Sequence, residues 1–309
     1  MNHVIYTILD WIDINKLDWN FLSLNPKAIK ILKENPDKIN WDNLSENPNA
    51  IELLKQNPDK INWDNLSSNP NGFQILKDHP NKIIWDDLSL NPNAIELLKE
   101  NIDKVDWYNL SSNPNAIEIL KENIDKIDWL GLSWNPNAIE ILKKNLNKVD
   151  WIYLSENKNA IEIIKENLDK VNWTQLSSNP NAIELLKDNP NKIFWNNSNF
   201  NQNAIELLKD HQDKINWHIL SLNPNPEAIK LLQKNKDKIN WMNLSMNPNP
   251  EAIKLLQKNK DKINWMNLSM NPSIFKLTIN FEPFEEQIII KDLHSYCKEL
   301  YYYNIEKNI

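Results

Sequence analysis

The stretch from Asn47 to Ser67 reads NPNAIELLKQNPDKINWDNLS, and close copies of it recur along most of the chain. Each copy contains one Trp. Ten of these stand 22 residues apart, and two more follow at a spacing of 24: Trp19, Trp41, Trp63, Trp85, Trp107, Trp129, Trp151, Trp173, Trp195, Trp217, Trp241 and Trp265. Self-similarity at a period of about 20–50 residues is the signature of a repeat architecture. We therefore predict that residues 15–272 form twelve units stacked in one elongated solenoid.

Each unit contains two segments with the pattern of a short helix. In the first, residues 50–54 (AIELL) supply an apolar stripe, and Asn47 followed by Pro48 is suited to begin the helix. In the second, Asn62 is suited to cap a helix that starts at Trp63. Both segments are shorter than the roughly 12–15 residues at which an isolated helix becomes marginal, so stacking must stabilise them. The predicted fold class is all-α, an α-solenoid of twelve two-helix repeats.

Two other folds have a similar period. The run Leu44-Ser-Glu-Asn47 matches the end of a leucine-rich repeat, but Asp42 stands where the preceding Leu is needed. A β-helix would show alternating β-branched residues, whereas residues 50–55 (AIELLK) favour a helix. The α-solenoid is therefore the favoured fold.

Residues 1–14 and 273–309 lie outside the repeat, and the end units of a solenoid need covering. We expect residues 1–14 to form an N-terminal capping helix and residues 273–309 to form a C-terminal capping segment with a long helix. The apolar side chains expected in the first are Val4, Ile5, Ile8, Leu9 and Trp11. Those at helical spacing in the second are Phe284, Ile288, Leu293, Tyr296 and Leu300.

Composition excludes several classes of function. The chain has a net charge of −7 and contains no Arg, so it lacks the guanidinium groups that read guanine or phosphate in a bidentate way. The lone Cys297 excludes an intramolecular disulfide. No apolar run approaches the roughly 18 residues needed to cross a membrane, and residues 1–14 do not resemble a signal peptide. We expect an intracellular protein without a membrane partner.

No residue pattern in the sequence indicates a catalytic, metal-binding or cofactor-binding site. The sequence offers no paired acid and base, no glycine-rich phosphate loop and no cluster with metal-ligand spacing. We therefore expect no enzymatic activity, no catalytic residue, no metal and no cofactor.

A Lys stands three residues before the Trp in every unit, from Lys16 to Lys262. This Lys column has two interpretations: a ladder of cations for a polyanion, or side chains that lie on neighbouring Trp rings. Residues 225–248 and 249–272 are identical copies with an inserted Asn-Pro step, expected to lengthen a loop, and with extra Lys. The candidate polyanion-binding residues are Lys230, Lys234, Lys236, Lys254, Lys258 and Lys260.

Positions that vary among otherwise constant units are where a solenoid carries binding information. Three positions vary most: the two residues after the Trp and the one after the Ser that follows. They are polar in the early units and include apolar or aromatic residues between the fifth and tenth units, which suggests a partner site unless an irregular stack buries them. The candidate partner-binding residues are Tyr108, Leu130, Trp134, Ile152, Tyr153, Phe200 and His218.

The unit of Trp195 departs from the pattern. It has Phe194 in place of a capping Asp or Asn, and Ser198-Asn199 in place of Leu-Ser. Gln202 also replaces a Pro. We expect a local irregularity in this unit.

The run from Asn47 to Ser67 resembles the short tandem repeats of large proteins encoded by giant double-stranded DNA viruses of protists. The resemblance covers residues 15–272, and residues 271–275 (NPSIF) with 283–286 (PFEE) resemble that family's closing segment. The resemblance implies a viral origin and a location in the host cytoplasm, a virus factory or the virion. It implies no particular activity and no functional residues. The expected function is a non-enzymatic protein–protein interaction scaffold with a viral or host protein partner. The alternative is binding of nucleic acid or another polyanion through the Lys column and the late Lys residues.

Overall fold

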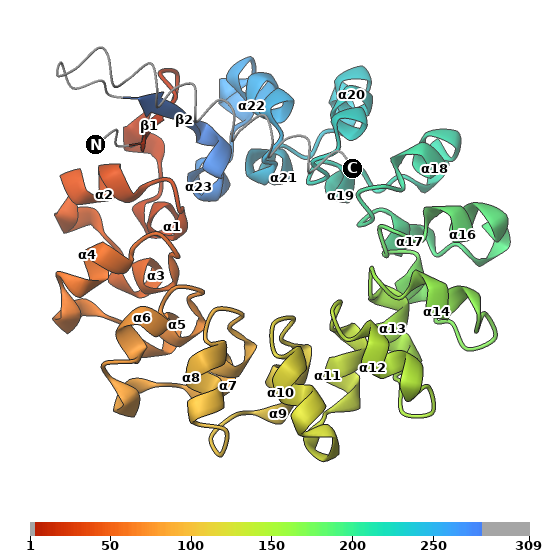
Figure 1. Ribbon diagram of the computed structural model, residues 1–309. Helices are drawn as coiled ribbons and strands as arrows, with labels where there is room; N and C mark the ends of the chain where they lie inside the picture. The colour runs from red at the N-terminus through yellow and green to blue at the C-terminus, as the bar shows by residue number, and fades with distance from the viewer. Residues whose placement is uncertain (1–3, 280–309) are drawn as a thin grey trace, which may run out of the picture.

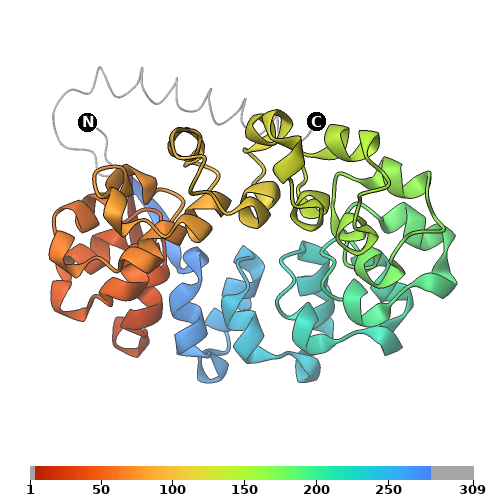
Figure 2. The ribbon, with the colours of Figure 1, turned by 90° about the horizontal axis from the view of Figure 1, so that it is seen from below.

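The computed structural model describes residues 4–279, which form pairs of short helices arranged in a ring (Figure 1). Along most of the ring the odd-numbered helices lie round a central opening and the even-numbered helices lie outside them, as is clear for α1 to α6 and for α16 to α23. In the view turned by 90°, the units near residues 100–150 lie above those near residues 220–270, so the two sides of the ring are offset along its axis (Figure 2). The predicted all-α solenoid of two-helix repeats is confirmed.

The inner helices are α1 (Trp19–Leu24), α3 (Trp41–Glu46), α5 (Trp63–Ser68), α7 (Trp85–Leu90), α9 (Trp107–Ser112), α11 (Trp129–Trp134), α13 (Trp151–Glu156), α15 (Trp173–Leu176), α17 (Trp195–Ser198), α19 (Trp217–Leu220), α21 (Trp241–Met246) and α23 (Trp265–Met270). The outer helices are α2 (Ile29–Glu34), α4 (Ile51–Lys55), α6 (Phe73–Leu76), α8 (Ile95–Glu100), α10 (Ile117–Glu122), α12 (Ile139–Lys144), α14 (Ile161–Lys165), α16 (Ile183–Asp188), α18 (Ile205–Asp210), α20 (Pro226–Lys234) and α22 (Pro250–Gln257). Short 3-10 helices such as Pro36–Lys38 and Pro58–Lys60 connect most outer helices to the next inner helix.

The inner helices begin where the sequence predicts. Each starts at its Trp, and in ten units the preceding Asn or Asp accepts hydrogen bonds from backbone N–H groups of the first turn, as Asn62 does from Asn65. Such a cap satisfies donors that have no partner within the helix. The two units without a polar cap have Ile84 and Phe194 at this position.

The prediction that Asn47 begins the outer helix is wrong. Asn47 is the C-cap residue of α3, and α4 begins only at Ile51 after a turn. In the two 24-residue units the inserted Asn-Pro step does create that start: Asn225 caps α20 and Pro226 is its first residue. The insertion therefore lengthens the outer helix, where we expected a longer loop.

The apolar core lies between the two layers. In most units the Leu of the inner helix, the Ala before the outer helix and the second Leu of the outer helix are fully buried, as are Leu44, Ala50 and Leu54. Burying one Leu side chain stabilises a fold by roughly 1.5–3 kcal/mol, and nearly every unit repeats this contribution. Because each helix alone is too short to be stable, this shared core holds the layers together.

A ladder of buried polar groups joins each unit to the next. The backbone N–H of Asn40 donates to Ser23 Oγ at 3.1 Å, and the Ser23 hydroxyl donates to the carbonyl of Trp19 at 2.7 Å. The Asn47 amide donates to the carbonyls of Ser23 and Asn25 at 2.9 and 3.0 Å. Buried carbonyls need such donors, which explains why these Ser and Asn positions hardly vary.

The last unit contacts the first through this same ladder. The N–H of Asp18 donates to Ser269 Oγ at 2.8 Å, and the Asn25 amide donates to the Ser269 carbonyl at 3.0 Å. Lys16 Nζ lies 5.3 Å from the centre of the Trp265 ring, as the Lys of other units lies over the preceding Trp. Helices α1 and α23 pack side by side. The repeat therefore closes on itself, and we call the α1–α23 interface the seam.

A two-stranded sheet spans the seam. Strand β1 (Val4–Ile8) pairs antiparallel with β2 (Phe275–Ile279), and Ile5 lies opposite Thr278. The Thr7 and Thr278 hydroxyls lie 2.7 Å apart. We call this pair of strands the clasp.

Two expectations about shape and ends are wrong. The solenoid is not elongated, because its two ends meet. Residues 4–8 form a strand and not a capping helix, because β-branched residues favour pairing once residues 275–279 lie alongside. The closing helix expected between residues 284 and 300 lies outside the described residues.

Candidate interaction surface of the ring

The variable positions of the repeat lie on the inner helices. In most inner helices the Leu is buried against the outer layer and the Ser against the next unit, so residues one and five places after the Trp project from the other side. Because the inner helices surround the opening, this exposed side faces it. The sequence identified these positions without indicating that they face a common space.

The candidate partner-binding residues divide into two groups. Tyr108, Trp134 and Ile152 are each 48% exposed and belong to the neighbouring helices α9, α11 and α13. The half-buried Leu130 and Tyr153 lie on the same helices. We call these five residues the aromatic arc.

The second group lies elsewhere on the ring. Phe200, which is 64% exposed, follows α17, and the exposed His218 is on α19. The unit that contains α15 and α16 separates both residues from the aromatic arc along the ring. The structure therefore does not gather all seven candidates into one surface.

Gly131 is buried within the aromatic arc. A Cβ at this position would lie 2.7 Å from both the carbonyl oxygen of Tyr108 and the Ser112 Oγ. The absence of a side chain therefore allows α11 to approach α9 closely, which brings their exposed aromatic residues near one another. Gly131 therefore lies in the interface between units.

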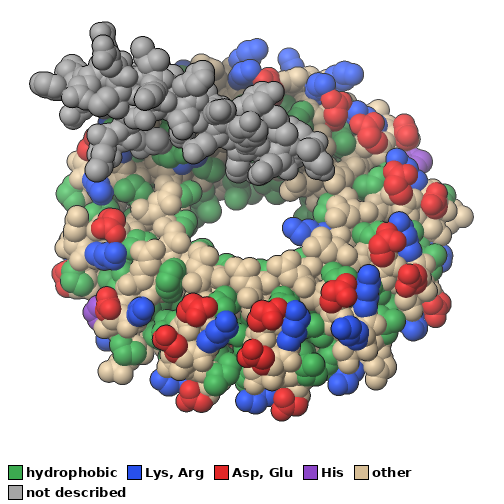
Figure 3. Space-filling model, in the orientation of Figure 1, with side chains coloured by type: hydrophobic (Ala, Val, Ile, Leu, Met, Phe, Trp, Pro, Cys, Tyr) green, Lys and Arg blue, Asp and Glu red, His purple; other side chains and the backbone are tan. Residues whose placement is uncertain are grey.

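Two features of these positions were not predicted from the sequence. The second residue after the Trp is often Asn, and its amide joins the ladder: Asn43 donates to the Asn20 carbonyl at 2.9 Å. The later inner helices also expose apolar side chains, including Met242, Met246 and Met266. The sequence could have indicated these exposed Met residues, since they occupy the same variable positions. Hydrophobic side chains are visible along the edge of the opening next to α21 and α23 (Figure 3).

Charge is distributed unevenly over the inner layer. At the three variable positions of the described inner helices, six residues are acidic and none is Lys. They are Asp42, Glu46, Asp64, Asp86, Asp87 and Glu156. Five of the six lie on α3, α5 and α7, directly before the aromatic arc, and we call these five the acidic arc. Positive charge is visible at the opposite edge of the opening, beside α17 and α19 (Figure 3).

The Lys column lies on Trp rings. The Lys38 ammonium is 4.7 Å from the centre of the Trp19 ring, and equivalent contacts occur for eleven of the twelve repeat Trp residues. The repeat Trp residues are half-buried and pack against the core, and in eleven units a Lys ammonium lies over the ring. Of our two interpretations, the contact with a neighbouring Trp is the one observed.

The candidate polyanion-binding Lys residues lie on the outer layer. Lys230 and Lys254 form ion pairs with Glu227 and Glu251, at 2.6 Å in each case. The remaining four, Lys234, Lys236, Lys258 and Lys260, are exposed on α20, α22 and the residues that follow them. None of the six belongs to an inner helix.

The predicted irregularity lies at the unit of Trp195. Helix α17 is short, and the amide of Asn199 replaces the usual Ser: it donates to the Trp195 carbonyl at 2.6 Å and accepts from the N–H of Asn216 at 2.7 Å. In the next unit Asn223 Nδ2, elsewhere a ladder donor, is buried without a partner among the described residues. Lys214 pairs with an adjacent Asp instead of covering Trp195.

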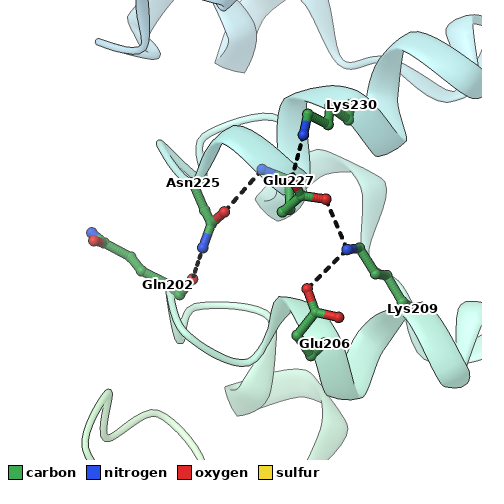
Figure 4. A network of polar contacts seen from close by, with 6 residues as sticks. All are labelled: Gln202, Glu206, Lys209, Asn225, Glu227 and Lys230. Carbon is green, nitrogen blue, oxygen red and sulfur yellow. Dashed lines mark hydrogen bonds and ion pairs between the residues drawn. The ribbon is translucent and has the colours of Figure 1, made fainter.

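An ion pair crosses between units at this irregular place. Lys209 of α18 contacts both Glu206 of its own helix, at 2.8 Å, and Glu227 of α20, at 2.9 Å (Figure 4). Asn225 donates to the Gln202 carbonyl at 3.1 Å beside it. Hydrogen bonds from Lys230 and Lys209 lower the pKa of Glu227 to about 2.

We expect the Glu227 carboxyl to report on this contact between units. Replacing Lys209 by Met should raise the pKa of Glu227 toward its ordinary range, measured from carboxyl carbon chemical shifts against pH. Since the folded-state pKa is depressed, the ion pair stabilises the fold above the ordinary carboxyl pKa of about 4.5, and this contribution is lost as the pH falls toward 2. Lys121→Met, which removes an ion pair with Glu118 on another outer helix, should leave the Glu227 titration unchanged. An ordinary pKa for Glu227 in the unaltered chain would contradict the assignment.

A groove of about 730 Å³ lies between the units of Trp195 and Trp217, where it is also lined by Lys214 and His218. Residues 4–279 contain no group of three or more His, Cys, Asp or Glu side chains placed to hold a metal ion. Over the same residues, no helix is long and apolar enough to cross a membrane. Comparison of the chain with protein-family models, curated proteins and solved structures finds no match.

Proposed function

We propose that this chain is a non-enzymatic scaffold that binds a protein partner within its ring. The observation that carries the proposal is the aromatic arc, in which Tyr108, Trp134 and Ile152 expose large side chains that the fold does not need. The same positions hold polar residues in other units, which stack with the same ladder. Exposed aromatic clusters are typical of the centres of protein interfaces.

The partner we propose is a viral or host protein, in line with the resemblance of the repeat to those of giant viruses. Polyanion binding stays as the alternative, and two observations count against it within the ring. The Lys column is engaged with Trp rings, and the three variable positions of the described inner helices hold six acids. A polyanion would have to bind the outer Lys residues.

The test compares two doubly substituted chains. Trp134→Ser with Ile152→Ser removes two of the three exposed side chains of the aromatic arc. Ile124→Ser with Leu168→Ser removes two exposed apolar side chains outside the inner helices. Proteins retained from host-cell lysate on the immobilised chain should be lost with the first variant and kept with the second. Both variants should melt within a few degrees of the unaltered chain, because exposed positions contribute roughly 0.5 kcal/mol or less. Equal retention by the two variants would exclude the aromatic arc as the binding surface.

A further inference from the structure

The opening is wide enough for a helix of another protein. Twelve inner helices packed at about 8–10 Å from their neighbours form a circle whose radius, measured to the helix axes, is roughly 15–19 Å. Subtracting the half-width of a helix with its side chains leaves an opening about 20–28 Å across, against about 10–12 Å for one α-helix. Figure 3 shows that described side chains leave the centre of the ring open.

The wall of the opening changes from acidic to aromatic between α7 and α9. Asp86 and Asp87 stand on α7, and Tyr108 stands at the equivalent place on the adjacent α9. A helix lying along α9 to α13 would therefore touch apolar side chains on one flank and carboxylates on the next. These neighbouring surfaces suit a segment with an apolar face beside a basic face.

We propose that the ring binds a basic amphipathic helix, with its apolar face on the aromatic arc and its Lys or Arg residues toward the acidic arc. This inference rests on the proposed function and adds the chemistry of the partner. Charge complementarity selects the occupant, because the three variable positions of the described inner helices hold six acids and no Lys.

The C-terminal residues of the chain itself are a poorer match. Residues 280–309 contain six acidic residues and three Lys, a net charge of −3, so the acidic arc would repel them. Nucleic acid would be repelled for the same reason. A second protein that supplies positive charge is the occupant that the wall favours.

The experiment uses the full chain and three fluorescein-labelled probes, followed by fluorescence anisotropy. The first is a synthetic helix of Leu and Lys, about 18 residues or five turns long, with all Leu on one face. The second replaces every Lys with Glu, and the third is a single-stranded RNA of similar length. We expect the Leu/Lys peptide to bind at least tenfold more tightly than either other probe, with affinity falling as salt rises.

Three variants of the chain locate the site. Asp42→Asn with Asp64→Asn and Asp86→Asn removes three exposed charges from the acidic arc and should weaken Leu/Lys binding about tenfold. The matched control removes the same charge from the outside through Glu100→Gln, Glu122→Gln and Asp125→Asn, and should bind as the unaltered chain does. Trp134→Ser with Ile152→Ser should weaken binding of the same peptide at all salt concentrations.

The outcomes separate the two proposals. If the Leu/Glu peptide binds as well as the Leu/Lys peptide and only the Ser variant loses binding, the basic partner is wrong and the aromatic arc remains the binding surface. If neither inner-layer variant changes Leu/Lys binding, both proposals fail. If the RNA binds more tightly than both peptides, the polyanion alternative replaces them.

Discussion

Replacing Asn135 by Leu is expected to lower the free energy of unfolding by about 2–4 kcal/mol. The Asn135 amide donates to the carbonyls of Ser111 and Asn113, at 2.9 and 2.8 Å, and all three residues are fully buried. Leucine has similar bulk but no amide. The Ser111 carbonyl then loses this donor, the Asn113 carbonyl keeps only the N–H of Ala116, and the N–H of Asn137 loses the Asn135 oxygen. A buried polar group left without a partner costs roughly 1–3 kcal/mol. Urea unfolding followed by circular dichroism measures the change.

The matched control is Asn137→Leu in the same unit. Asn137 also donates to the preceding unit, to the Pro114 carbonyl at 2.9 Å, but its side chain lies at the surface. Water can replace that donor, so the expected loss is below about 1 kcal/mol. Equal destabilisation by the two substitutions would show that burial of the ladder does not set its strength.

The second large effect is expected at the seam. Replacing Ile5 and Tyr6 by Pro should disrupt the clasp, since adjacent residues in an antiparallel pair alternate in hydrogen bonding and one Pro must remove a donor. We expect amide hydrogen exchange in α1 and α23 to quicken about a hundredfold, corresponding to roughly 3 kcal/mol. Exchange in α11 and α13, across the ring, should stay unchanged.

A complementary variant closes the seam covalently. Tyr6 and Leu277 lie directly opposite each other in the clasp, at a separation typical of disulfide-bonded residues. Tyr6→Cys with Leu277→Cys, in a chain where Cys297 is Ser, should form a disulfide and slow exchange in α1 and α23. If the Pro variant instead quickened exchange throughout the ring, the clasp would act on the whole fold and not only on the seam.

The repeat itself could be predicted because its information is local. The Asn or Asp before each Trp caps the helix that follows, and the buried Leu positions recur with the unit, so two helices per repeat follow from one unit's sequence. The prediction that the Asn at the end of the inner helix begins the outer helix was wrong for a physical reason. Asn47 has the sequence context of an N-cap, yet its amide is needed by carbonyls of the preceding unit, 22 and 24 residues away.

Closure of the ring could not be predicted from any one unit. It depends on the rotation between units, which no single side chain specifies, and on contacts between residues about 250 positions apart. The strand at residues 4–8 could not be predicted either, because its partner strand lies at the other end of the repeat region. The sequence does identify the variable positions, but only closure turns them toward one space and places the aromatic arc beside the acidic one.

Closure of the ring also fixes the number of units that it can contain. In an open stack, unequal recombination between identical copies, such as residues 225–248 and 249–272, would change only the length. Here twelve interfaces share a full turn, about 30° each on average, and a thirteenth unit would require about 28° at every interface. Gain or loss of one copy would therefore misalign the clasp strands. The geometry penalises changes in copy number that the sequence, with two identical neighbours, makes easy.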